Sequence, residues 1–252
     1  METKLTVVVD NIACDNLAGE WGLCILAEHR GKKILVDAGA SELFAENMQK
    51  LGFEINDVDY ATLSHAHYDH ANGMPRFFKE NDHAKFYIRD AAEENCYGKK
   101  WIFSRYIGMP KGVLADYANR IEKVSGDYQV MDGAWLIPHK TEGLEAIGKR
   151  ESMYQRNGKR WRPDNFNHEQ SLVLETDCGL VIINCCSHGG AVNIINEVAA
   201  TFPDKPVYGI IGGFHLFNKS EEEVRAVARK LIDTGVKSVS YTHLTLPTSL
   251  RV

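Results

Sequence analysis

The chain has 252 residues, of which 44% are apolar and 25% charged, and its formal net charge is -5. This length and composition are typical of one globular domain, or at most two small ones. The acidic balance argues against a dedicated nucleic-acid binder, which usually carries a basic excess.

The sequence pattern predicts no targeting or membrane segment. Residues 1–4 lack the basic and then apolar layout of a signal peptide, and an apolar run such as residues 179–186 is far too short to cross a bilayer. We therefore expect a cytoplasmic protein. Its six cysteines include no C-x-x-C pair, which favours reduced thiols in and around the core.

Strand and helix signals alternate along most of the chain. β-branched runs mark the strands, and apolar side chains at helical spacing mark the helices. In chain order the predicted elements are a strand (5–10), a hairpin turning at 30–32 (22–37), a helix capped by Ser41 (41–51), three strands (60–64, 85–89 and 135–138), a second hairpin (171–184), a helix (191–200), a strand (207–211) and a helix opened by the capping box of Ser220 and Glu223 (220–234). The pattern weakens between 91 and 124. This order predicts a layered α/β or α+β domain with sheet inside and helices outside.

The strongest chemical signal is the motif His65-Ala66-His67-Tyr68-Asp69-His70, directly after a predicted strand. Side chains two apart in an extended segment point the same way, so His65 and His67 can grip one ion. Asp69 and His70 then hold a neighbouring ion from the next bend. Imidazole and carboxylate together suit zinc, iron or manganese, and the lack of thiolates argues against a purely structural zinc.

At these residues the sequence resembles the metallo-β-lactamase superfamily, whose signature is this H-x-H-x-D-H loop. Three further stretches resemble family motifs: 35–39, 186–190 and 211–216. The resemblance implies a four-layer αββα sandwich. Within the superfamily, the sequences at 64–73, 168–172, 185–190 and 212–216 look most like a subgroup of metal-dependent hydrolases related to a dihydropterin ribofuranosylaminobenzene 5′-phosphate synthase.

The resemblance implies a set of metal ligands, position by position. His65, His67 and His188 would hold a first ion, and Asp69 and His70 a second. His215 stands where many relatives have a bridging aspartate, and neutral imidazole does not bridge two ions as a carboxylate does. We therefore expect one or two divalent ions, with zinc first and manganese or iron as alternatives.

Other roles for three of these positions stay open. Asp69 could orient a metal-activated water, and Asp37 could accept a proton from a ligand histidine and fix its tautomer. Asp37 is alternatively a turn carboxylate at a strand end. His188 alone could cap the helix that starts near residue 191, and His215 could be a satisfied core histidine.

Basic side chains interleaved with aromatic ones gather in two regions, at 99–106 and 149–162. Such groups could hold a phosphate and stack a flat heterocycle, although a solvated loop is an alternative interpretation. The predicted substrate-binding residues are Lys99, Arg105, Arg156, Arg160 and, from the subgroup motif, His168.

The last residues match the translation of a laboratory sequencing adapter. Residues 239–248 correspond to one reading frame of a transposon-end sequencing adapter, and the preceding bases fit Ser238. We therefore predict a domain over residues 1–237 and an adapter-derived tail over 238–252. A metal-binding histidine of the resembled subgroup belongs about where His243 lies, so His243 is a ligand candidate only if the tail is native.

The resulting prediction is an enzyme, a metal-dependent hydrolase whose metal-activated hydroxide attacks an ester, lactone or phosphoester. Two alternatives stay open: a transferase that joins a pterin diphosphate to an aminobenzene ribotide and releases diphosphate, and a metal-binding sensor without turnover. The expected partner is a small molecule, phosphorylated or pterin-like for the transferase, and neither a membrane nor a nucleic acid. The sequence predicts no oligomeric state.

Overall fold

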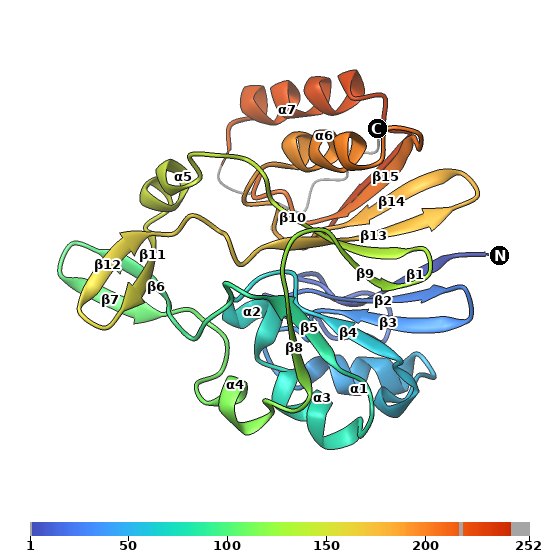
Figure 1. The fold of residues 1–252 in the computed structure, drawn as a ribbon, viewed down its shortest axis with the longest axis horizontal. Coiled ribbons are helices and arrows are strands. Elements are labelled where there is room, and N and C mark those ends of the chain that lie inside the picture. The colour runs from blue at the N-terminus through green and yellow to red at the C-terminus, as the bar shows by residue number, and fades with distance from the viewer. Residues whose placement is uncertain (1, 217–218, 243–252) are drawn as a thin grey trace.

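Two sheets face each other through the middle of the molecule, and helices cover their outer faces (Figure 1). The computed structural model describes residues 2–216 and 219–242. Helices α1 (Leu43–Lys50) and α3 (Met74–Glu80) lie against one sheet, and α6 (Ala191–Thr201) and α7 (Glu221–Asp233) lie against the other. The predicted four-layer αββα sandwich is confirmed.

Each sheet of the sandwich mixes antiparallel hairpins with parallel strands. In order across the first sheet the strands are β1 (Lys4–Val9), β2 (Cys24–His29), β3 (Lys32–Val36), β4 (Tyr60–Thr62), β5 (Phe86–Arg89) and β8 (Ile121–Val124). Across the second sheet they are β16 (Ser238–Tyr241), β15 (Val207–Gly212), β14 (Gly179–Ile183), β13 (Gln170–Thr176), β10 (Ala134–Pro138) and β9 (Tyr128–Met131). The parallel pairs run from β3 to β8 and from β14 to β16.

The core has three parts, one between each pair of layers. Along β2, Leu26 joins the core beneath α1, whereas Ile25 joins the core between the two sheets. Along β13, Leu172 faces the other sheet and Val173 faces α6. Burying each such side chain stabilises the fold by about 1.5–3 kcal/mol, so a one-residue slip of either strand would misplace its whole set.

The predicted core elements agree with the structure within a few residues. Both hairpins, the helices and the capping box of Ser220 and Glu223 are confirmed. Helix α1 begins later than expected: its N-cap is Glu42, and Ser41 Oγ instead accepts a hydrogen bond from the Leu43 amide.

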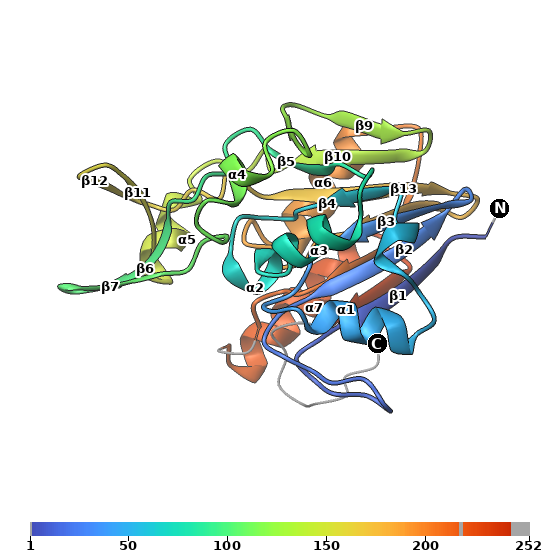
Figure 2. The ribbon, with the colours of Figure 1, turned by 90° about the horizontal axis from the view of Figure 1, so that it is seen from below.

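A third sheet projects from one end of the sandwich as an arm (Figure 2). Its strands, in order, are β12 (Arg160–Pro163), β11 (Met153–Asn157), β6 (Cys96–Lys100) and β7 (Phe103–Tyr106). Residues 99–106 and 153–162 of the two basic and aromatic regions lie on this arm sheet, whereas Lys149 and Arg150 end helix α5 (Glu145–Arg150). The tip between β6 and β7 exposes Trp101, Ile102 and Phe103, at 84%, 89% and 72%. Because the arm sheet reaches a core only at its root, at Cys96, its strands lack the alternation that sequence analysis depends on.

The remaining elements are short and lie in the connections between strands. They are η1 (Ile55–Asp57), α2 (Tyr68–Ala71), α4 (Val113–Asp116) and α5 (Glu145–Arg150). None of the helices in the described part of the chain is long and apolar enough to span a lipid bilayer.

The predicted foreign tail begins at the first residue of strand β16. Strand β16 pairs in parallel with β15, from Ser238 beside Gly209 to Tyr241 beside Gly212. The sheet therefore continues four residues beyond Lys237, and the origin of residues 238–252 stays a prediction. His243 lies outside the described residues.

Candidate metal centre

The histidine motif is held at the end of β4 by the buried carboxylate of Asp37, which follows β3. Asp37 Oδ1 accepts from the Ser64 amide and Oδ2 from the Ser64 hydroxyl, both at 2.6 Å. Asp37 Oδ2 also lies 2.7 Å from His70 Nδ1. One carboxylate thus ties both ends of the motif to β3. The contact with His70 has the geometry that the predicted tautomer-fixing role requires, and the role itself stays a prediction.

Three imidazole rings converge above this anchor, from two distant parts of the chain. The ring centroid of His65 lies 4.6 Å from that of His67 and 5.1 Å from that of His188. All three side chains are buried, and one nitrogen of each lies within 4.8 Å of the others. His65 Nε2 and both nitrogens of His188 make no hydrogen bond within residues 2–216 and 219–242. Buried, unsatisfied nitrogens are what a bound divalent ion would satisfy, so this donor set fits a metal.

The charge state of the rings also suits metal binding. Burial, with the neighbouring imidazoles, lowers the pKa of His65 and of His188 well below the ordinary value. Both rings are therefore neutral, the form that ligates metals. Burial opposes protonation of His67 as well, but the Asp164 carboxylate and the Cys96 thiol outweigh it and raise the pKa of His67 to about 9. A metal at His67 would compete with a proton.

A second group of candidate ligands adjoins the first. Asp69 Oδ2 lies 3.6 Å from His70 Nε2, and Cys186 Sγ lies 3.2 Å from the same nitrogen. The ring of His215 lies 4.4 Å from that of His188, in a backbone conformation with positive φ. The structure thus brings together His65, His67, Asp69, His70, His188 and His215. Their ligation stays a prediction.

Cys186 is a site residue that sequence analysis missed. It was expected to be a core thiol, yet its sulfur joins two groups of candidate ligands, with His65 and His70 and with His188 and His215. Burial, followed by nearby carboxylates, raises the pKa of Cys186, so the thiol is protonated. The available signal was its place two residues before His188.

The alternative interpretation of His188 as a helix cap is wrong. The N-cap of α6 is Gly190, and no side chain caps that helix. The ring of His188 instead stacks on Phe166, with centroids 4.2 Å apart and planes 7° from parallel. Stacking and burial hold the ring in one orientation toward His65 and His67.

The predicted substrate-binding residues are divided between the arm sheet and the interior. Lys99 and Arg156 both lie 5.3 Å from the ring of Trp161, and Arg160 opens β12 on the same sheet. Arg105 lies 5.8 Å from the ring of Tyr68, which follows His67 in the chain, so Arg105 connects the arm sheet to the ligand loop (residues 65–70). His168 is buried with both ring nitrogens engaged, which fits support of the ligand loop better than contact with a substrate.

A buried charged cluster that sequence analysis also missed supports His188 from behind. His139 Nε2 lies 2.9 Å from Glu169 Oε2, and His139 Nδ1 lies 3.4 Å from Glu197 Oε2 on α6. Glu169 Oε1 in turn accepts a hydrogen bond from the His188 amide at 3.2 Å. A side chain at Gly189 would place its Cβ 2.6 Å from the His139 ring, so the loop that carries His188 fits closely over this cluster. Glu169 follows His168 in the stretch 168–172, which resembles the subgroup. That position was the signal in the sequence that could have identified Glu169.

This cluster predicts a pH-dependent stability. Burial opposes a charge on His139, but Glu169 and Glu197 outweigh it and raise its pKa from 6.5 to about 10. Because the pKa of His139 is higher in the folded protein than in the unfolded chain, the charged ring stabilises the folded state. This stabilisation is fully present below pH 6.5 and is lost as the pH rises through about 10. His139→Gln should therefore lower the free energy of unfolding by about 3–5 kcal/mol at pH 6, and by much less above pH 10. Urea unfolding across this range, with the exposed His83→Gln as control, measures the difference; a pH-independent difference would contradict it.

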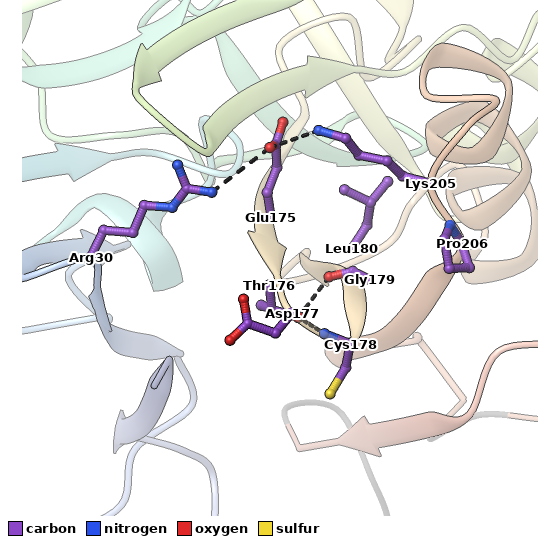
Figure 3. Close-up of a pocket in the computed structure, with 9 residues that line it drawn as sticks. All are labelled: Arg30, Glu175, Thr176, Asp177, Cys178, Gly179, Leu180, Lys205 and Pro206. Atoms are coloured by element: carbon purple, nitrogen blue, oxygen red, sulfur yellow. Dashed lines mark hydrogen bonds and ion pairs between the residues drawn. The ribbon is translucent and has the colours of Figure 1, made fainter. Parts of the chain in front are cut away.

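A surface depression of about 300 Å³ lies at the β13–β14 turn (Figure 3). This turn is at the opposite end of β13 from His168, which precedes the strand. Its Glu175 lies 2.7 Å from Lys205 and 3.9 Å from Arg30. Because these charges satisfy one another, the depression lacks the convergent unsatisfied groups of the histidine cluster.

Comparison with known proteins agrees with this geometry. The family described as the metallo-beta-lactamase superfamily matches residues 22–194. The 7,8-dihydropterin-6-methyl-4-(β-D-ribofuranosyl)-aminobenzene-5′-phosphate synthase of Methanocaldococcus jannaschii is 27% identical over 270 residues, which cover 94% of this chain and 88% of the synthase. The crystal structure of Tm1679, a metal-dependent hydrolase of the β-lactamase superfamily, has a TM-score of 0.82 at 25% identity, over 98% of this chain and 90% of that one. The predicted resemblance is confirmed: with its αββα sandwich and H-x-H-x-D-H loop, the chain belongs to the metallo-β-lactamase superfamily.

Proposed function

We propose that the protein is a metal-dependent hydrolase acting on an ester, lactone or phosphoester. The observation that carries this proposal is the convergence of His65, His67 and His188, whose buried nitrogens include four without a hydrogen bond among the described residues. The fold of the superfamily supports a hydrolase-like, metal-dependent activity. Zinc is the first candidate ion, because imidazole and carboxylate ligands suit it.

The residues divide the work between binding and proton handling. His65, His67 and His188 would hold one ion, and Asp69 and His70 would hold a second, with His215 as a further candidate ligand beside His188. The chemistry that such an ion supplies is a lowered pKa of water and a polarised carbonyl or phosphoryl oxygen. Asp69 lies at the edge of the cluster, 7% exposed, where its carboxylate can orient water and accept a proton. Asp37 holds His70 Nδ1, so His70 Nε2 faces the cluster.

A panel of ester, phosphodiester and lactone substrates tests the proposal. We expect zinc-loaded protein to hydrolyse at least one of p-nitrophenyl acetate, bis(p-nitrophenyl) phosphate and a γ-lactone, and chelation to abolish the activity. Turnover that persists in His67→Ala would contradict the proposed site. Stoichiometric zinc uptake without turnover on any substrate would favour the sensor.

A transferase is a second candidate, favoured by two observations. The synthase relative matches 94% of the chain, and the arm sheet carries cations beside aromatic rings, with Arg105 next to the ligand loop. Such a surface can hold phosphate and stack a flat ring. Mixing a pterin diphosphate with an aminobenzene ribotide should then release diphosphate only when both are present. Release from the pterin diphosphate alone would indicate hydrolysis.

A further inference from the structure

Four buried groups form a second cluster on the side of His67 that faces the arm sheet. They are His67, Cys96, Asp164 and His168, and one polar atom of each lies within 4.8 Å of the others. The cluster could be a metal site of its own, or it could support the ligand loop. The hydrogen bonds of His168 decide between these alternatives.

His168 cannot offer a lone pair to a metal in this cluster. Its Nδ1 accepts a hydrogen bond from the Ala66 amide at 3.1 Å, so the ring proton resides on Nε2. Nε2 lies 3.1 Å from Asp164 Oδ2 and donates to it. A nitrogen that carries a proton does not ligate, and the cluster is therefore a hydrogen-bond network.

Asp164 is fixed in place by several donors. Its Oδ1 accepts from the Phe166 amide at 2.8 Å and from Gln155 Nε2 at 2.9 Å, while Oδ2 accepts from His168. The side chain is 1% exposed, so its charge is stabilised by these donors rather than by water. Asp164 Oδ2 also lies 3.9 Å from His67 Nε2, a buried nitrogen with no hydrogen bond within the described residues.

We propose that Asp164 and His168 form a brace that orients the metal-binding histidines. The Asp164 carboxylate draws the His67 proton to Nε2, which leaves Nδ1 for the ion. His168 joins this carboxylate to the Ala66 amide and so holds the backbone between His65 and His67. The two residues are positioning residues, because both side chains are about 1% exposed and act through His67 and the Ala66 amide. The inference rests on the proposed metal site and names the residues that preorganise it.

The brace also connects the ligand loop to the arm sheet. Gln155 lies on β11, where it pairs with Cys96 of β6, and its side chain donates to Asp164. A displacement at the root of the arm sheet would therefore move Asp164 and, through it, the ring of His67. This places the support of the first metal ligands outside the sandwich itself.

The test combines ring tautomers with metal affinity in Asp164→Ala. Long-range ¹H–¹⁵N NMR of metal-free protein at about pH 10, above the pKa of about 9 at which the His67 ring becomes neutral, should show His67 as the Nε2–H tautomer in the original chain and as a mixture of tautomers in the variant. The zinc dissociation constant, measured by competition with a chromophoric chelator, should rise about 10–100-fold. Asp164→Asn keeps the shape of the side chain and one acceptor oxygen. Its zinc dissociation constant should therefore lie between those of the original chain and of Asp164→Ala.

The control separates positioning from stability. Asn81→Ala removes a buried amide that donates to the Ile55 and Val58 carbonyls, away from the histidines. It should destabilise the fold and leave zinc affinity within about threefold. Unchanged tautomers in Asp164→Ala, unchanged zinc affinity, or an equal loss of affinity in Asn81→Ala would each overturn the proposal. If the original chain binds no zinc, the proposed function fails, while the tautomer of His67 still decides the brace.

Discussion

Replacing His188 by alanine is expected to remove metal-dependent activity while leaving the fold intact. Neither ring nitrogen of His188 makes a hydrogen bond in the described part of the chain, so the substitution leaves no protein partner unsatisfied. What is lost is one ligand and a ring stacked on Phe166. Because a metal contributes several kcal/mol to the transition state, the rate should fall by about 10²–10³-fold or more.

The measurement is the initial rate of hydrolysis, with bound metal determined by mass spectrometry on the same sample. The matched control is His83→Ala, an exposed histidine beside Asp82. Full activity in His188→Ala would remove this residue from the site. A lost circular-dichroism signal would contradict the expectation that the fold is retained.

The second large effect is expected at Asp37→Ala, on stability rather than on chemistry alone. The buried carboxylate accepts from the Ser64 amide, the Ser64 hydroxyl and His70. Its removal leaves these donors buried without their acceptor, so we expect the free energy of unfolding to fall by about 3–5 kcal/mol.

Urea unfolding of metal-free protein measures this effect directly. Asp59→Ala is the control, because Asp59 makes comparable bonds to Lys32 and to the Lys33 amide at a partly exposed position. Asp59→Ala should lower the free energy of unfolding by about 1 kcal/mol or less. An equal loss in the two variants would show that Asp37 is an ordinary turn carboxylate, the alternative left open by the sequence.

The parts of the fold that face a core were predictable from sequence. Strand β13 alternates its side chains between two cores, and α7 begins at a capping box, so periodicity and capping identify both. The arm sheet was not predictable, because side chains such as Trp101 and Phe103 project into solvent and follow no buried face. Hydrophobic periodicity arises from burial of one face of an element, so it does not identify strands that bury no face.

The candidate site divides in the same way. His65 and His67 stand in one short motif, so spacing alone groups them. His139 and Glu169 are 30 residues apart in the printed sequence, and their pairing exists only after β10 and β13 align. Cys186 stands two residues before His188, but no spacing rule assigns its sulfur to the cluster.

The candidate site lies between two halves of the chain, one that forms the first sheet (residues 4–124) and one that forms the second (residues 128–241). This position has a consequence for folding. The contacts that build it join residues far apart in the chain: Ala66 to His168 across 102 positions, and His70 to Cys186 across 116. Closing such long loops costs entropy before any contact repays it, which places these contacts late in assembly. A chain with one half folded has no complete site, so metal uptake during refolding would report the docking of the two halves. An ion that binds only the docked state would also stabilise it by mass action.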